Sequence, residues 1–191
     1  GAVAVIVTSA DRAKDLAQPP AYVRGFAQAH SHDNGRTDRD SLLVSPAARS
    51  KERAFSMADA TLEEVSQCQL YDCYTYTVLV TLEDYGFCKK GEGGDYVSSG
   101  IIRLGGERPN NTSGGHLCEG YTHGINMVIE NVRQLRHDVD DYCPRDANGV
   151  VQHSYDYSEG GCRQVKDVEL TANLGWGTPG MGSAMVMARG T

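Results

Sequence analysis

The chain has 191 residues, 40% of them apolar, which is the length and composition of one globular domain with a buried core, not of a disordered chain or a fibre. Its formal net charge is −7 and its acidic residues are scattered, so it lacks the basic stripe that binds nucleic-acid phosphates or anionic membrane surfaces. We therefore expect neither nucleic acid nor a membrane as a partner.

The chain opens on an apolar run, GAVAVIVTS. This run is far shorter than the roughly 20 residues that span a bilayer, and no basic segment precedes it, so it predicts a buried strand and not a signal peptide. Because the chain begins on this strand without an initiator Met, we expect it to be a piece of a longer protein.

Turn formers and helix caps divide the first half of the chain. Ser9 is a candidate N-cap for a short helix, which the prolines at 19–20 end. Residues 21–29, AYVRGFAQA, favour a strand. Pro46 then opens a helical region, whose clearest amphipathic part is SMADATLEEVS at 56–66.

The middle of the chain predicts a strand, a turn at Tyr71 and a helix that Gly86 ends. Residues 87–100 form a glycine-rich loop. The segment 125–136, INMVIENVRQLR, is the best amphipathic helix of the protein. Its predicted buried stripe consists of Ile125, Val128, Ile129, Val132 and Leu135.

Residues 137–161 have turn chemistry and few aliphatic side chains, so they predict a surface insertion. Two strands follow, within VKDVELTANLGW and SAMVMARG, and the turn GTPGMG joins them into a hairpin. Alternating strands and helices with a closing hairpin indicate an α/β layered domain with a mixed sheet.

Two polar segments stand where a strand or a glycine turn gives way to a helix, positions at which loops line ligand sites in α/β proteins. One is YDCY at 71–74, and the other is the turn at 115–124, which continues the glycine segment NNTSGG and contains EGYTHG. Considered alone, a tyrosine is more often a packing residue and a loop histidine is more often solvated, so both interpretations stay open here.

Five segments occur in the order that resembles the C-terminal half of thiolase-superfamily proteins of the lipid-transfer branch: GAVAVIVTSADRA, EEVSQCQLYDCYTYT, GFCKKGEGGDYV, NTSGGHLCEGYTHGINMVIENVRQLR and a final strand, glycine-rich turn and strand. The resemblance implies that residues 1–191 are a thiolase-like C-terminal half. Residues 1–8 would be the last strand of an N-terminal half that is otherwise absent, and residues 137–161 an insertion.

Departures from the family pattern indicate the chemistry. Where thiolases carry an HDCF-type motif this chain has Tyr71, and where they carry GHP it has Tyr121, while the closing turn holds no cysteine. A phenol with a pKa near 10 activates a thiol poorly at neutral pH, so Claisen chemistry is disfavoured. The pattern resembles the thiolase-like aldolases of steroid side-chain degradation.

That resemblance implies retro-aldol cleavage of a β-hydroxyacyl-CoA, namely a 17-hydroxy C22 steroid acyl-CoA, into a 17-ketosteroid and propionyl-CoA. Tyr71 and Tyr121 would be the acid/base pair, with their order left open, and His123 would orient Tyr121. The substrate-binding positions that it implies are Asn111, Gly114, Gly115, Tyr74 and Gly182.

The resemblance also implies the partners: an acyl-CoA substrate, a homodimer, and a second protein with an OB-fold and a zinc ribbon, giving a heterotetramer. No cofactor is expected, because coenzyme A enters only with the substrate and zinc would belong to the partner. Six cysteines without a C-x-x-C pair favour free thiols in a reducing cytoplasm. Two alternatives stay open: a non-catalytic acyl-CoA or sterol-binding subunit, and a divergent thiolase.

Overall fold

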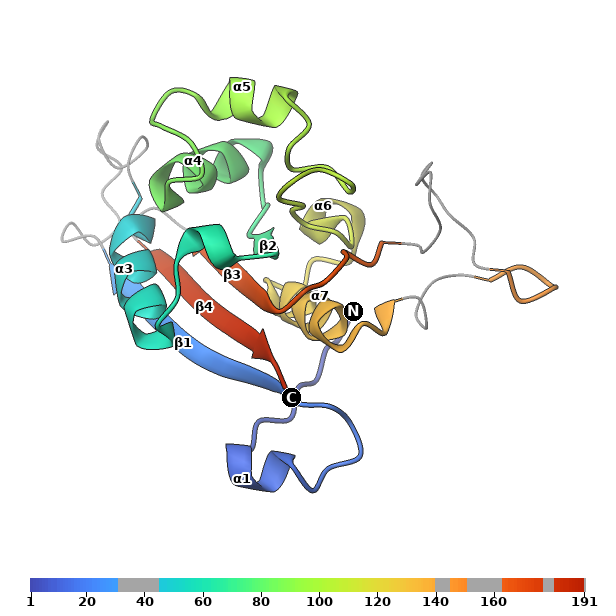
Figure 1. The fold of residues 1–191 in the computed structure, drawn as a ribbon. Coiled ribbons are helices and arrows are strands. Elements are labelled where there is room, and N and C mark those ends of the chain that lie inside the picture. The colour runs from blue at the N-terminus through green and yellow to red at the C-terminus, as the bar shows by residue number, and fades with distance from the viewer. Residues whose placement is uncertain (31–44, 140–144, 151–162, 177–180, 191) are drawn as a thin grey trace.

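A four-stranded mixed sheet forms the centre of the computed structural model (Figure 1). The structure describes residues 1–30, 45–139, 145–150, 163–176 and 181–190. The sheet has the order β1-β4-β3-β2, built from β1 (Ala21–His30), β2 (Gln67–Leu70), β3 (Leu170–Trp176) and β4 (Met181–Arg189). Strands β3 and β4 form the predicted antiparallel hairpin, β1 pairs β4 antiparallel and β2 pairs β3 in parallel, so the predicted mixed α/β sheet is confirmed.

Helices cover both faces of this sheet (Figure 1). Helix α3 crosses β1 and β4 on one face, α7 lies on the other, and α4, α5 and α6 gather beyond one end of β2. The helices are α1 (Ala10–Ala13), α3 (Ala47–Ala58), α4 (Thr75–Tyr85), α5 (Gly93–Ser98), α6 (Gly115–Cys118) and α7 (Ile125–Arg136), with a 3₁₀ helix, η1, at Leu62–Glu64.

The face of the sheet toward α3 is apolar. Alternate residues of β3 and β4 point to it, and with α3 they make the main hydrophobic core, which includes Ala54, Phe55, Leu174, Ala184 and Val186. A Cβ on Gly25 of β1 would lie 2.0 Å from the carbonyl oxygen of Ala54, so the absence of a side chain there lets helix and strand approach closely.

The opposite face of the sheet, toward α7, carries a small apolar cluster beside a polar layer, so the prediction for α7 holds only in part. Of the predicted stripe, Leu135 is buried and Val128 and Val132 pack against its cluster, as predicted. Ile125 and Ile129 are only partly buried, and the helix also buries the polar side chains of Glu130, Asn131 and Gln134. These polar groups meet Gln67 of β2 and other polar residues in a hydrogen-bonded layer that we call the polar core. Its members are Gln67, Gln69, Thr112, Glu130, Asn131, Gln134, Arg163 and Asn173.

The strand predicted at residues 1–8 is not formed in this structure. Within this segment, Ile6 is 92% exposed. An apolar run becomes a strand only where another strand offers backbone partners, and no described strand pairs with this one.

Other boundaries differ from the prediction as well. The helix opened by Pro46 ends at Ala58, where Asp59 adopts a left-handed conformation, so 56–66 is not one amphipathic helix. The loop predicted at 87–100 contains α5, whereas α4 ends at Gly86 as predicted. The predicted insertion at 137–161 lies mostly outside the described residues.

The cysteines of the described residues are free thiols, as predicted: Cys68, Cys73, Cys88 and Cys118. No group of three or more potential metal ligands occurs in the part of the chain that the structure describes. Within the same residues, every helix is too short or too polar to cross a bilayer.

Candidate functional site

The site begins where β2 ends. The backbone N–H of Tyr71 donates to the carbonyl oxygen of Leu174 at 3.0 Å, which extends the β2–β3 pairing one residue beyond the strand. The hydroxyl of Thr77, in the first turn of α4, contacts the carbonyl oxygens of Tyr71 at 3.2 Å and Tyr74 at 2.6 Å. Strand end and helix start thus hold the segment 71–74 between two fixed elements.

The glycine turn packs directly on this segment. Gly114 and Gly115 both have positive φ angles, 98° and 63°, which other residues rarely adopt. A Cβ on Gly115 would lie 2.1 Å from Oδ2 of Asp72, so only glycine lets the buried carboxylate approach. Asp72 Oδ1 accepts a hydrogen bond from the backbone N–H of His116 at 2.8 Å, which joins the two loops.

A third contact fixes the loop that carries Tyr121. Asn126, in the first turn of α7, donates to Glu119 Oε2 at 2.7 Å and accepts from the hydroxyl of Thr122 at 3.0 Å. These hydrogen bonds fix Glu119 and Thr122, which flank Tyr121 in the loop. The hydroxyl of Tyr121 then lies 3.0 Å from the hydroxyl of Tyr71, a hydrogen bond between residues that are 50 positions apart.

Two histidines complete an aromatic cluster around these tyrosines. The ring of His116 lies 4.7 Å from Tyr71 and 5.1 Å from Tyr121, measured between centroids. The ring of His123 lies 4.6 Å from Tyr121 in an edge-to-face arrangement. Tyr121 is 56% exposed whereas His116 is only 4% exposed, so the cluster runs from the surface into the protein.

The environment favours the neutral form of both Tyr71 and His116. Burial raises the pKa of Tyr71 well above the usual 10, and the hydrogen bond with Tyr121 adds to this. Burial also lowers the pKa of His116; Asp72 opposes this shift, and His123 adds to it. At neutral pH Tyr71 therefore holds its proton, and His116 is uncharged.

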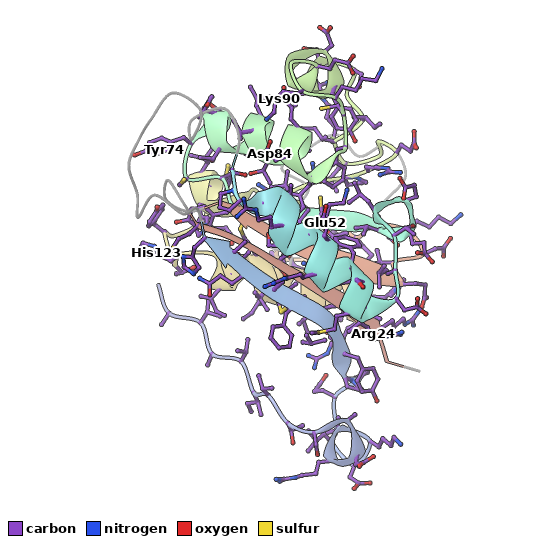
Figure 2. The ribbon with its side chains drawn as sticks, turned by 90° about the vertical axis from the view of Figure 1, so that its left-hand side faces the viewer. Arg24, Glu52, Tyr74, Asp84, Lys90 and His123 are labelled. Atoms are coloured by element: carbon purple, nitrogen blue, oxygen red, sulfur yellow. The ribbon has the colours of Figure 1, made fainter. Side chains whose placement is uncertain are left out.

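The structure brings together all three predicted catalytic residues, since Tyr71, Tyr121 and His123 are members of this cluster. His123 has a φ of 54°, a left-handed conformation that is uncommon outside glycine, and its exposed side chain lies near the same edge of the molecule as Tyr74 (Figure 2). Tyr74 is 71% exposed and forms the N-cap of α4.

The other predicted binding positions differ in what they contact. The side-chain oxygen of Asn111 accepts a hydrogen bond from the backbone N–H of Leu70 at 2.7 Å, and its side-chain nitrogen donates to the carbonyl oxygen of Leu70 at 3.0 Å. The side chain thus pairs with Leu70 as a neighbouring strand residue would. Gly182 lies against the start of α3, where a Cβ would be 2.8 Å from the nitrogen of Ala47. Gly114 and Gly115 shape the turn beside Asp72.

Sequence reasoning included Asp72 and His116 in candidate site loops but assigned neither residue a role in the site. His116 is the first residue after two glycines with positive φ, and such a pair signals a backbone that folds back tightly. That signal marks a close approach but does not identify the partner, because the contact depends on residues more than 40 positions away.

A mixed sheet that a hairpin closes, with site loops after β2 and before α7, is the architecture expected of a thiolase-type α/β domain. The family model described as Thiolase C-terminal domain-like matches residues 27–161. The chain belongs to this family, as the resemblance predicted.

Comparison with curated proteins finds two related lyases. The 17-hydroxy-3-oxo-4-pregnene-20-carboxyl-CoA lyase of Mycobacterium tuberculosis is 41% identical over 142 residues, which are 71% of this chain and 36% of that protein. The steroid side-chain-cleaving aldolase of Thermomonospora curvata is 35% identical over 140 residues, again 71% of this chain and 36% of that one.

A solved structure, the Ltp2-ChsH2(DUF35) aldolase, superposes with a TM-score of 0.75 and 27% identity, over 94% of this chain and 42% of that chain. The predicted resemblance to thiolase-like steroid side-chain-cleaving aldolases is thereby confirmed. The chain spans a little over a third of the length of the two lyases.

Proposed function

We propose that this chain forms the tyrosine-bearing half of an aldolase active site that cleaves a β-hydroxyacyl-CoA by a retro-aldol reaction. The observation that carries the proposal is the 3.0 Å hydrogen bond between the hydroxyls of Tyr71 and Tyr121. The two lyase relatives support it through their names, which describe steroid side-chain cleavage and a CoA lyase.

The reaction needs a proton to leave the β-hydroxyl and a proton to reach the α-carbon. As the Cα–Cβ bond breaks, its electron pair forms the thioester enolate and the carbinol becomes a ketone. Two hydrogen-bonded tyrosines can transfer the proton in a relay: one phenol accepts the hydroxyl proton while it passes its own to the second, which protonates the α-carbon. The relay returns both phenols to neutrality, so the high pKa of Tyr71 is no obstacle.

The finer assignments belong to the same proposal. The substrate would be a 17-hydroxy C22 steroid acyl-CoA, cleaved to a 17-ketosteroid and propionyl-CoA. The similar solved structure is named for two components, the second with a DUF35 domain, so we propose a partner protein of this kind. His123 would orient Tyr121 through their edge-to-face contact.

The test uses the full-length protein with its OB-fold partner. It follows ketone and propionyl-CoA from the steroid acyl-CoA for wild type, Tyr71→Phe and Tyr121→Phe. Each variant should keep substrate binding and lose about 10²- to 10⁴-fold in rate. Tyr96→Phe is the matched control, because no hydrogen-bond partner of the Tyr96 hydroxyl occurs among the described residues.

Other results would overturn the proposal. A wild type that binds acyl-CoA without turnover would indicate a binding subunit, and acyl transfer between CoA thioesters would indicate a divergent thiolase. Normal cleavage by both tyrosine variants would show that the pair does not transfer the proton.

A further inference from the structure

His116 is the most deeply buried ring of the aromatic cluster, and the proposed proton relay does not use its side chain. Neither ring nitrogen has a hydrogen-bond partner among the described residues, and both nitrogens are sealed from solvent. The ring nevertheless contacts both Tyr71 and Tyr121. A buried imidazole without partners is unfavourable, so its presence beside the two hydroxyls calls for a role that depends on its position.

We infer that His116 is a positioning residue: its uncharged ring packs against the rings of Tyr71 and Tyr121 and holds their hydroxyls within hydrogen-bonding distance. This inference rests on the proposed function for its catalytic consequence. Direct contact with substrate is excluded in this conformation, because neither nitrogen is accessible. His116 therefore acts through the tyrosines.

The backbone explains how the ring is kept in place. The N–H of His116 is anchored to Asp72, the neighbour of Tyr71 in sequence, and the glycines before His116 allow that close approach. A Cβ on Gly124 would lie 3.5 Å from the ring of Tyr71 and 3.9 Å from Nε2 of His116, so the start of α7 closes over both rings. Loop 71–74, the glycine turn and α7 thus meet at this one side chain.

Protonation would disrupt the arrangement, since a sealed imidazolium has no acceptor or water for its two N–H groups. Five titratable side chains face His116 from the elements packed around it: Tyr71, Asp72, Glu119, Tyr121 and His123. Burial lowers the pKa of His116 despite the opposing carboxylates, so the charged form accumulates only below the usual value of about 6.5. Activity that depends on the neutral ring should decline in that acid range.

The test compares His116→Ala with His116→Phe in the full-length protein with its partner. Alanine removes the ring, and kcat should fall about 10- to 100-fold, as expected for misplaced reacting groups, with KM within about threefold of wild type. Phenylalanine keeps both ring contacts without buried nitrogens, and it should restore kcat to within about threefold. The acid decline in kcat should be present in wild type and absent in the Phe variant.

A crystal structure of each variant makes the inference testable even where turnover fails. The hydroxyls of Tyr71 and Tyr121 should remain hydrogen-bonded in His116→Phe and separate in His116→Ala. Hydroxyls that stay paired in the Ala variant would overturn the inference, and so would a Phe variant as slow as the Ala variant. Absence of cleavage by wild type would instead count against the proposed function and leave the structural outcome to decide the role of His116.

Discussion

Replacing Glu130 by glutamine should loosen α7 from the segments that pack against it, which include Thr112 and Arg163. The Glu130 carboxylate is 1% exposed and accepts hydrogen bonds from Thr112 at 2.7 Å and from Gln134 at 3.0 Å. It also forms a paired contact with Arg163, whose nitrogens lie 3.0 to 3.2 Å from the two oxygens. Glutamine would remove the charge and turn a hydrogen-bond donor toward groups that are themselves donors.

The magnitude follows from the burial of this ion pair. Removing one partner of a buried pair costs roughly 3–5 kcal/mol, because the other charge stays buried without compensation. The side chain of Arg163 is 18% exposed, so water compensates part of its charge and we expect the lower end of that range, about 3 kcal/mol. At 1.4 kcal/mol for each factor of ten, this corresponds to roughly a 100-fold shift in a local opening equilibrium.

Hydrogen exchange of the full-length protein measures that shift directly, since amides in α7 exchange through local opening. Peptides that cover 125–136 should exchange about 100-fold faster in Glu130→Gln than in wild type. Glu169→Gln is the matched control: its pair with Arg189 is exposed on both sides and should contribute only about 0–1 kcal/mol. Unchanged exchange of α7 in Glu130→Gln would refute the view that the polar core holds this helix.

Two further predictions concern packing and thiol reactivity. Gly25→Ala places a methyl group 2.0 Å from the carbonyl oxygen of Ala54, so it should lower the thermal unfolding midpoint by several degrees, whereas Gly120→Ala, with open space around it, should not. Burial raises the pKa of the Cys68 thiol, whereas Cys118 is exposed. At pH 8 iodoacetamide should therefore modify Cys118 and leave Cys68 unmodified in the native protein, as measured by peptide mass spectrometry. Modification of Cys68 at a rate similar to that of Cys118 would contradict the burial argument.

Local sequence signals predicted the elements that end at residues with special backbone preferences, such as glycine. Gly86 ends α4 in a left-handed conformation, and β3 and β4 pair antiparallel, as the glycine-rich sequence between them predicted. Such residues act within a few positions of themselves, so their effect can be derived without knowledge of the rest of the fold. The tyrosines at 71 and 121 were predicted as one pair from the family resemblance, and their hydroxyls do lie within hydrogen-bonding distance.

Tertiary structure alone decided which surfaces meet. Helix α7 buries Leu135 of its apolar stripe as predicted, yet it also buries Glu130 and its polar neighbours, because the sheet face opposite carries Gln67 and other polar residues. A helical pattern predicts the face that prefers an apolar environment, but the partner surface determines which face is buried. His116 likewise joined the tyrosines only through the fold, since its anchor, Asp72, is 44 positions away in the chain. The sequence by itself thus determined the elements that carry their own end signals and predicted the pairing of the two tyrosines, and the packing of distant segments decided the polar core and the contacts that support the site.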